Sequence, residues 1–491
     1  MLDLRSMASL KGKRIHLVGI KGTGLCALAE LCQAHGATLS GSDVSETFYT
    51  DAILARLSIP VKVFSASNIV DGIELVVHSA AYKPDSHEEL LAAAERGILV
   101  INYPTALGLI SGLQVSCAIA GVHGKTTTTA LAGSLVQATG LAATVLAGSA
   151  VSSFGDRSTL VQGSDYFIAE TCEYRRHFLH FRPAIILVTS IEPDHQDYYP
   201  DYQAMLAAFV EFCLLLPQGG RLVYCADDPG AAELATIMAA QRSDLIQIPY
   251  GFEASGPFRI TSLRLNAAGL RLSSNDFCLQ ASGSQAYSLH LPGRHLVLDA
   301  AGAIALHCTL IHDLAGRVLD NGLFAALAAG IAAFKGSRRR VELIGEANGI
   351  VYMDDYAHHP TAVRLTLQGL RQFHPGRRLV VDFMSHTYSR TTSLFTEFSQ
   401  AFADADYLVL HDIYPSAREN APDSYPVNGF MLFEAIQKRG VSAVFFSQPL
   451  EAVEHLRGVL QSGDLFISMG AGDNWQLSHE LYRLGVEGSG A

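Results

Sequence analysis

The stretch that most constrains the fold is residues 117–129, which read CAIAGVHGKTTTT. A short apolar run leads into a glycine loop, and small apolar residues at helical spacing follow it. This order predicts a strand, a phosphate-binding loop and a helix, in which backbone N–H groups and the helix N-terminus face an anion. An ordinary glycine-rich turn is the alternative, but Gly-Lys-Thr at a helix start favours phosphate.

Each residue type in the loop has a predicted role in nucleotide binding. Lys125 would supply a positive charge to the outer phosphates, and the hydroxyl of Thr126 would bind Mg²⁺. The loop is a short variant, because Ile119 stands where the usual pattern has a glycine. The residues expected around the phosphates are Gly121, Val122, His123, Gly124, Lys125, Thr126 and Thr127.

Length and composition limit the classes of protein that fit. The 491 residues are enough for about three domains. No apolar run approaches the roughly 18 residues of a membrane helix, and the start lacks a hydrophobic signal core. We therefore expect a cytoplasmic protein without membrane insertion. The net charge of −12 argues against nucleic-acid binding, and the eight cysteines form no C-x-x-C pair, which favours core thiols in a reducing compartment.

The N-terminal part, residues 1–113, predicts a Rossmann-like domain. The strand RIHLVGI runs into a turn that contains Gly19, Gly22 and Gly24, where a backbone can approach a diphosphate. A second strand ends at Ser42 and Asp43, the place where doubly wound folds contact a ribose or sugar. Further apolar strands, one of them carrying Ser79, alternate with helices and complete an open parallel α/β sheet.

The central part, residues 114–336, predicts an α/β ATPase domain around the phosphate loop. Two strands, YFIAE and AIILVTSI, end in the carboxylates Glu170 and Glu192, and His195 and Asp197 follow. Carboxylates and a histidine at the C-terminal edge of a sheet, beside a phosphate loop, suit a metal ion held against phosphate. Each of these residues taken singly is more typical of a solvated loop.

The last part, residues 337–491, predicts a second Rossmann-like domain. Apolar strands of 4 to 8 residues alternate with helical stretches. Their ends carry Asp355, the pair His358 and His359, then His386 and Arg390. Adjacent histidines suggest zinc, but consecutive side chains diverge and no further Cys or His stands at ligand spacing.

Several of these motifs resemble the Mur ligases, the ATP-dependent amino-acid ligases of peptidoglycan assembly. The glycine loop is similar to the nucleotide loop of that family, and Phe334-Lys-Gly-Ser-Arg-Arg-Arg is similar to its F-x-G-x-x-R-R hinge motif. DDYAHHPT and HTYSR resemble the signatures of the alanine-adding branch. The resemblance covers essentially the whole chain, with the motifs in order.

The resemblance implies roles for individual residues of this chain. The implied catalytic residues are Lys125, Glu170, His195 and Arg340, and the implied metal ligands are Thr126, Glu170 and His195. Beyond the loop, the implied nucleotide contacts are Asp299, Arg339, Arg340 and Asp355. The implied substrate contacts are Gly22, Gly24, Ser42, Asp43, Ser79, His359, His386 and Arg390. It also implies ATP and Mg²⁺ as cofactors, and UDP-N-acetylmuramate and L-alanine as substrates of a monomer or homodimer.

Some positions depart from the family pattern. Lys21 and Leu25 differ in the N-terminal glycine turn, and Cys172 stands where the alanine-adding branch commonly has aspartate. Ser190 replaces one family asparagine. Leu296 replaces another, and because leucine cannot hydrogen-bond a base, the usual contact with the nucleotide is in doubt. Asp299 is either a polar substitute or a helix-surface residue.

Two alternatives remain from the sequence. One is a ligase that attaches a recycled murein tripeptide to the same sugar nucleotide, although the short segment after Glu170 and the presence of Gly24 favour the alanine-adding branch. The other is a non-catalytic sensor of UDP-muramyl ligands, which intact Lys125 and His195 disfavour. Arg390 is either a clamp for the incoming carboxylate or the partner of a structural carboxylate.

Overall fold

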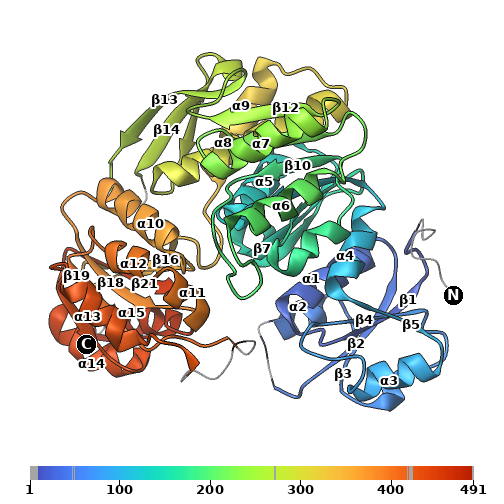
Figure 1. Ribbon diagram of the computed structural model, residues 1–491, viewed down its shortest axis with the longest axis horizontal. Helices are drawn as coiled ribbons and strands as arrows, with labels where there is room; N and C mark the ends of the chain where they lie inside the picture. The colour runs from blue at the N-terminus through green and yellow to red at the C-terminus, as the bar shows by residue number, and fades with distance from the viewer. Residues whose placement is uncertain are drawn as a thin grey trace. The chain divides into compact units, whose positions relative to one another are not determined.

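The fold is described from a computed structural model, which places residues 9–46, 48, 50–269, 272–416, 419 and 424–488. These residues form a mixed α/β structure with parallel sheets, as the sequence predicts (Figure 1). Two compact units divide the chain. The first takes in residues up to 191, 206–250 and 302–330, and the second takes in 192–205, 251–301 and the residues from 331 onward.

The N-terminal sheet has the strand order β3-β2-β1-β4-β5, and all its pairings are parallel. Its core contains Val18, Val76 and Leu90. Parallel strands buried on both faces read as apolar runs, which is why the alternation was visible in the sequence. The elements are β1 (Arg14–Val18), α1 (Thr23–Ala34), β2 (Thr38–Asp43), α2 (Thr50–Arg56), β3 (Val61–Val63), η2 (Ala66–Asn68), β4 (Leu75–His78), α3 (Glu88–Glu95), β5 (Leu99–Asn102) and α4 (Tyr103–Ser111).

The central sheet continues the first unit with the order β12-β11-β10-β6-β9-β7-β8. Its pairings are parallel except at the β7–β8 edge. The elements are β6 (Val115–Ala120), α5 (Lys125–Thr139), β7 (Ala143–Val151), η3 (Ser152–Phe154), β8 (Arg157–Val161), β9 (Tyr166–Glu170), η4 (Tyr174–His180), β10 (Ile185–Val188), α6 (Tyr202–Cys213), β11 (Arg221–Cys225), α7 (Pro229–Gln241) and β12 (Ile246–Gly251).

An ion pair with a buried carboxylate joins helix α1, which belongs to the N-terminal sheet, to the central sheet. Glu30 of α1 is 5% exposed and accepts hydrogen bonds from Arg157 Nη1, at 2.7 Å, and from the hydroxyl of Thr159. Both donors lie on β8. Burial of a carboxylate is tolerated where such partners satisfy it. The two sheets of the first unit are therefore fixed to one another by a specific contact.

The second unit contains an antiparallel group and a mixed sheet. The antiparallel strands are β13 (Phe258–Asn266), β14 (Ser274–Leu279) and β15 (Ala286–Leu289), with η5 (Gln280–Ser282) between them. The mixed sheet has the order β16-β17-β21-β18-β19-β20, parallel except at β16–β17. Its elements are β16 (Glu342–Ala347), β17 (Ile350–Asp355), α10 (Pro360–Phe373), β18 (Arg378–Met384), α11 (Tyr388–Ser393), α12 (Phe395–Gln400), β19 (Tyr407–Leu410), α13 (Gly429–Gln437), β20 (Ala443–Phe445), η8 (Pro449–Ala452), α14 (Val453–Val459), β21 (Asp464–Gly470) and α15 (Trp475–Gly488).

Two further helices, α8 (Arg294–Thr309) and α9 (Asn321–Ala333), contribute residues to both units, and a π turn, η6 (Leu310–Leu314), follows α8. Residues Arg294–Leu314 form a continuous helix of 21 residues that is long and apolar enough to cross a membrane. The segment reaches this length by its mean hydropathy, although Asp299 and His307 interrupt it, so it is not an uninterrupted apolar run in the sequence. Most of the segment is buried inside the structure, as in the core helix of a soluble protein.

Candidate functional site

The glycine loop lies between β6 and α5, as predicted. Gly121 has φ of +138° and Gly124 has φ of +78°, which L side chains rarely adopt. A Cβ on Gly121 would also collide with the side chain of Thr189 and approach Ser190 N to 2.9 Å. Only glycine fits at position 121. The shape of the short glycine loop therefore depends on its own sequence and also on the segment after β10, which contains Thr189 and Ser190.

Thr189 and Ser190 hold the phosphate loop in shape. Ser190 accepts hydrogen bonds from Val122 N through its carbonyl, at 2.9 Å, and from His123 N through its hydroxyl, at 3.0 Å. The Thr189 hydroxyl donates to the carbonyl of His123. The sequence marked Ser190 only as a departure from the family. In the structure this serine has a definite role, because its hydroxyl satisfies a loop N–H group.

Lys125 begins α5 and is mostly buried, with 13% of its side chain exposed. Its ammonium donates to the carbonyl of Gly121, to that of Val122 at 3.3 Å, and to Glu173, whose carboxylate oxygens lie at 3.1 and 2.9 Å. Burial acts to lower the pKa of Lys125, but the neighbouring carboxylates, Glu173 above all, hold that pKa above its usual value. The ammonium is therefore charged and bound to its own loop.

Glu170 ends β9 beside the loop and meets the chemistry required of a metal ligand. One of its oxygens, Oε2, is buried and lacks a hydrogen-bond partner among the residues that the structure describes. Gly148 of β7 leaves room for this carboxylate, because a Cβ there would approach Glu170 Cδ to 2.7 Å. Thr126 lies in the first turn of α5. A buried acceptor without a partner fits a hard cation such as Mg²⁺, which prefers oxygen ligands.

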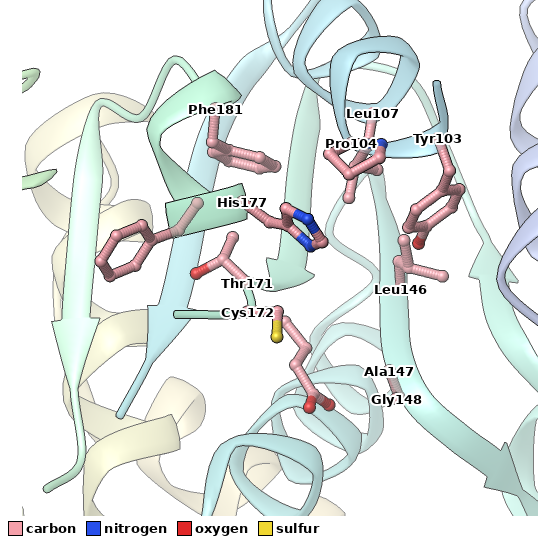
Figure 2. Close-up of a pocket in the computed structure, with 12 residues that line it drawn as sticks. Tyr103, Pro104, Leu107, Leu146, Ala147, Gly148, Thr171, Cys172, His177 and Phe181 are labelled. Atoms are coloured by element: carbon pink, nitrogen blue, oxygen red, sulfur yellow. The ribbon is translucent and has the colours of Figure 1, made fainter. Parts of the chain in front are cut away.

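A cavity of about 170 Å³ opens beside Glu170 within the first unit (Figure 2). Figure 2 shows Tyr103 and Leu107 of α4 opposite His177 and Phe181, with the thiol of Cys172 between them. The full lining consists of Tyr103, Pro104, Leu107, Leu146, Ala147, Gly148, Glu170, Thr171, Cys172, His177, Phe178 and Phe181. Tyr103, which the sequence analysis did not select, also limits Gly24, since a Cβ there would lie 3.3 Å from its ring.

In the N-terminal domain, the predicted substrate residues divide into two groups. Gly22 caps α1 without a side chain, and Gly24 lies in the first turn of that helix. Ser42 is completely buried, and its hydroxyl donates to Glu89. Asp43 is 4% exposed and accepts a hydrogen bond from Lys21 N at 2.6 Å. Ser42 and Asp43 therefore shape the glycine turn from within, and their role as direct substrate contacts stays a prediction.

Ser79 follows β4 beside the same turn. Its N–H group donates to Val18 O at 3.1 Å, and its hydroxyl accepts from Ala81 N at 3.3 Å. A Cβ on Gly19 would lie 3.1 Å from Ser79 Cβ, so the two segments are in close contact. Ser79 is only partly exposed. The structure brings Ser79 next to the glycine turn, and its role as a substrate contact stays a prediction.

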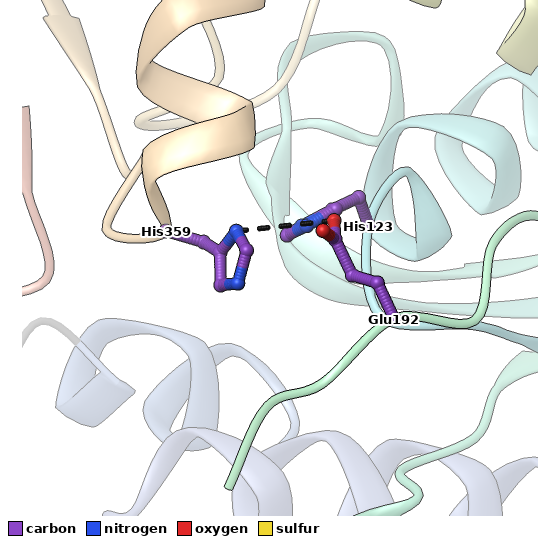
Figure 3. A group of neighbouring side chains, drawn as sticks. All are labelled: His123, Glu192 and His359. Atoms are coloured by element: carbon purple, nitrogen blue, oxygen red, sulfur yellow. Dashed lines mark ion pairs between the residues drawn. The ribbon is translucent and has the colours of Figure 1, made fainter. Parts of the chain in front are cut away.

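Within the second unit, Glu192 and His359 face one another (Figure 3). The distance from His359 Nδ1 to Glu192 Oε1 is 3.8 Å, and Thr361 Oγ1 donates to the other Glu192 oxygen at 3.0 Å. His359 also caps α10 by accepting from Thr361 N at 3.3 Å. His195, in the same unit, has φ of +54° and its N–H donates to Asp194 at 2.8 Å. Its role as a metal ligand stays a prediction.

Arg390 is engaged with a carboxylate of the protein itself. It is 5% exposed, and its guanidinium donates to Asp194 from Nε at 2.8 Å and from Nη2 at 3.3 Å. A third hydrogen bond reaches the carbonyl of His386 at 2.5 Å. Burial, together with the Arg390 charge, lowers the pKa of His386 to about 4. In the structure Arg390 is thus the partner of a structural carboxylate, which is the second of the two roles considered from the sequence. The sequence analysis did not identify Asp194 as that carboxylate.

The predicted nucleotide contacts of the last domain also make internal bonds. Arg339 donates to Asp354 at 3.0 Å and to the carbonyl of Gly470 at 2.8 Å. Asp355 accepts from the N–H groups of Val341 and Ala357, both at 2.7 Å. Burial raises the pKa of Asp355, while the positive charge of Arg340 acts to lower it.

The two other predicted nucleotide contacts are Arg340 and Asp299. Arg340 lies over the Tyr356 ring, and Asp299 is 7% exposed within α8. Their contacts with a nucleotide stay predictions.

Family models match the chain in three successive segments. Residues 14–114 match the Mur ligase family, catalytic domain, residues 119–307 match the Mur ligase middle domain, and residues 339–472 match the Mur ligase, glutamate ligase domain. The chain belongs to the Mur ligase family.

Within that family, the chain is similar to the UDP-N-acetylmuramate–L-alanine ligase of Treponema pallidum, at 48% identity over 96% of this chain and 97% of the relative. The enzyme of that name from Desulfitobacterium hafniense is 39% identical over 95% of this chain and 99% of its own length. Among solved structures, the UDP-N-acetylmuramate–alanine ligase of Thermotoga maritima shares the fold with a TM-score of 0.73 at 23% identity, over 97% of this chain and 99% of that one. A murein peptide ligase from Psychrobacter arcticus gives 0.62 at 22% identity, over 96% and 98%.

Proposed function

We propose that this protein joins L-alanine to the carboxylate of UDP-N-acetylmuramate with hydrolysis of ATP, in peptidoglycan biosynthesis. The observation that carries the proposal is the phosphate loop with its buried Lys125 and the unpartnered oxygen of Glu170 beside it. Full-length relatives that are 48% and 39% identical bear the name of this enzyme.

The reaction proceeds in two balanced steps. A carboxylate oxygen of the muramyl group attacks the γ-phosphorus of ATP, and the bond to the leaving oxygen of ADP breaks. The amine of L-alanine then attacks the acyl phosphate, loses a proton and displaces inorganic phosphate, which leaves an amide. Little covalent chemistry falls to the protein, so positioning and charge stabilisation dominate.

The residues of the phosphate loop perform the charge stabilisation. Lys125 places a permanent positive charge at the start of α5, where the helix N-terminus adds to it. To reach a phosphate, its ammonium exchanges Glu173 and two loop carbonyls for phosphate oxygens. Thr189 and Ser190 keep the loop N–H groups in place during this exchange.

Thr126 and Glu170 are the residues of the first unit that would hold Mg²⁺. When bound, the ion neutralises negative charge on the nucleotide phosphates and on the transferred phosphoryl group. The proposal also assigns the boundaries of the three domains to residues 113/114 and 336/337. The protein works in the cytoplasm, in keeping with its eight free cysteines.

The test is a phosphate-release assay with ATP, UDP-N-acetylmuramate and one amine at a time. We expect kcat/KM for L-alanine to exceed that for L-serine and glycine by about 10-fold to 200-fold at most, because one small group in an apolar pocket discriminates no better. The tripeptide L-Ala-γ-D-Glu-meso-diaminopimelate should give the lowest value.

Two results would contradict the proposal. Preference for the tripeptide would assign the protein to murein recycling. Tight binding of the UDP-sugar without ligation of any amine would indicate a sensor.

A further inference from the structure

Lys21, in the glycine turn before α1, is the centre of a hydrogen-bond network that the family pattern does not predict. Its N–H donates to Asp43 Oδ2 at 2.6 Å, and its carbonyl accepts from Thr50 Oγ1 at 2.6 Å. Its ammonium donates to the carbonyls of Val44 at 3.1 Å and Glu46 at 2.7 Å. A single residue thus binds the following segment through its backbone and its side chain.

That segment connects β2 to α2, and these bonds hold its described residues 43–46, 48, 50 and 51 near both ends. Asp43 and Thr50 are 4% and 1% exposed, so the anchoring bonds are shielded from water. Asp51 accepts a hydrogen bond from Phe48 N at 2.7 Å and lies 3.3 Å from the Lys21 ammonium. Phe48 is 44% exposed, and its ring centroid is 6.0 Å from that ammonium.

The position of the segment gives it a function in ligand binding. In open parallel α/β sheets, ligands bind outside the carboxyl ends of the strands, and the residues after the second strand contact the ribose. Residues 43–51 follow β2, the neighbour of β1, and β1 leads into the glycine turn. An exposed aromatic ring in such a segment offers a surface on which a base can stack.

The environment of the Lys21 ammonium distinguishes positioning from direct phosphate binding. The ammonium has three N–H donors, and it has two carbonyl oxygens and the Asp51 carboxylate around it. Lys21 is 9% exposed, and a buried charge with a full set of partners is costly to detach. In this structure the lysine therefore serves the segment after β2, and a comparison of UDP with uridine decides whether it also reaches a diphosphate.

We propose that Lys21 is a positioning residue for a uridine nucleotide. It holds the residues that it contacts after β2, namely Asp43, Val44, Glu46, Thr50 and Asp51, in the conformation that receives the nucleoside, without contacting the diphosphate. The nucleotide part of this inference rests on the proposed function.

The experiment compares Lys21→Met with the wild-type protein in the binding of UDP, by calorimetry, and of uridine, by ligand-observed NMR. We expect both Kd values to rise by a similar factor of at least about 10, because the ordered segment serves the nucleoside in both ligands. Amide hydrogen exchange in residues 43–46, 48, 50 and 51 should become faster. Thr50→Val, which removes the bond to the Lys21 carbonyl, should act in the same direction.

Lys62→Met is the matched control, since Lys62 is an exposed lysine on β3 of the same domain. It makes the same change of charge and should leave both Kd values and the exchange rates unchanged. Circular dichroism and retained ATP binding check that the Lys21 and Thr50 variants are folded.

Two outcomes would overturn the inference about Lys21. Weaker binding of UDP with unchanged binding of uridine would make Lys21 a diphosphate ligand. Unchanged binding of both, with unchanged exchange, would leave it no positioning role. If the wild-type protein binds neither ligand, the proposed UDP-sugar site and the nucleotide part of this inference both fail. The exchange comparison then still decides whether Lys21 orders residues 43–46, 48, 50 and 51.

Discussion

The ion pair between Lys125 and Glu173 leads to an unusual prediction. Mutation of a buried acid near an active site usually weakens ligand binding, but here it should strengthen it. Glu173 is 2% exposed and binds the Lys125 ammonium, the group proposed to bind the nucleotide phosphates. ATP must compete with this carboxylate for Lys125. Glu173→Gln keeps the size of the side chain and removes its charge. We therefore expect the substitution to tighten nucleotide binding.

The magnitude follows from the bonds that change. A hydrogen bond to a charged group contributes about 1.5–3 kcal/mol, and Lys125 gives up its contact with Glu173 when it turns to phosphate. Each 1.4 kcal/mol changes an affinity about tenfold. The Kd for ATP should thus fall by about 10-fold to 100-fold in Glu173→Gln. The protein without nucleotide should lose stability, because the Lys125 ammonium then faces a neutral amide in place of a carboxylate.

The assay is calorimetric titration of ATP in EDTA, so that the nucleotide and the lysine are compared without a divalent cation. Glu211→Gln is the control, since Glu211 is a half-exposed acid of the central domain, on α6, whose partner is Arg176. It removes the same charge away from the loop and should change the Kd by less than about twofold.

An unchanged or weaker affinity of Glu173→Gln for ATP in EDTA would refute the reasoning. It would mean that Lys125 keeps its carboxylate partner when nucleotide binds. Tighter binding in EDTA together with weaker binding in Mg²⁺ would keep the argument and make Glu173 a metal ligand in addition.

Three further outcomes are expected. Lys125→Ala should lower the rate of phosphate release by at least about 100-fold, because a charge aimed at the transition state is lost, while circular dichroism stays unchanged. GTP should support more than about a thousandth of the ATP rate, because Leu296, 5% exposed, cannot read a base by hydrogen bonding. Burial acts to raise the pKa of Glu89, but hydrogen bonds from His16 and its other partners lower that pKa to about 2. The ionised Glu89 carboxylate stabilises the folded protein by about 2–3 kcal/mol, fully above pH 4.5, and this contribution is lost as pH falls through 2. The free energy of unfolding in urea should therefore differ between Glu89→Gln and the wild type at pH 6, and differ less at pH 3.

The sequence predicted the fold class well because its strongest signals are local. The run before Gly121 is apolar on both faces, as a central parallel strand requires, and β6 lies where it was expected. The apolar strands of the last domain were found for the same reason. The helix Arg294–Leu314 was not predicted, because Asp299 and His307 interrupt its apolar run in the sequence while both are buried in the structure.

The candidate site was predicted less completely, because side-chain pairing is not a local property. The sequence placed Lys125 and Glu170 at one sheet edge, and the structure brings both there. It could not show that Ser42 turns inward to Glu89, or that Arg390 finds Asp194, a residue 196 positions away in the chain. Glu173 was visible three residues after Glu170, but its pairing with the loop lysine depends on how β9 ends.

The ion pair of Glu30 and Arg157 has a consequence for thermodynamic coupling between substrates. Through it, α1 with its glycine turn is fixed to β8, and β8 is linked by β7 and β9 to β6, which leads into the phosphate loop. The spacing of the N-terminal glycine turn and the loop before α5 is thus set before either ligand arrives. Neither ligand loses binding free energy to the ordering of the two turns, because the turns are already aligned. Within this unit the binding free energies of the two ligands should therefore be additive. Loosening that link would turn two independent sites into cooperative ones, in which the first ligand orders the frame that the second one uses.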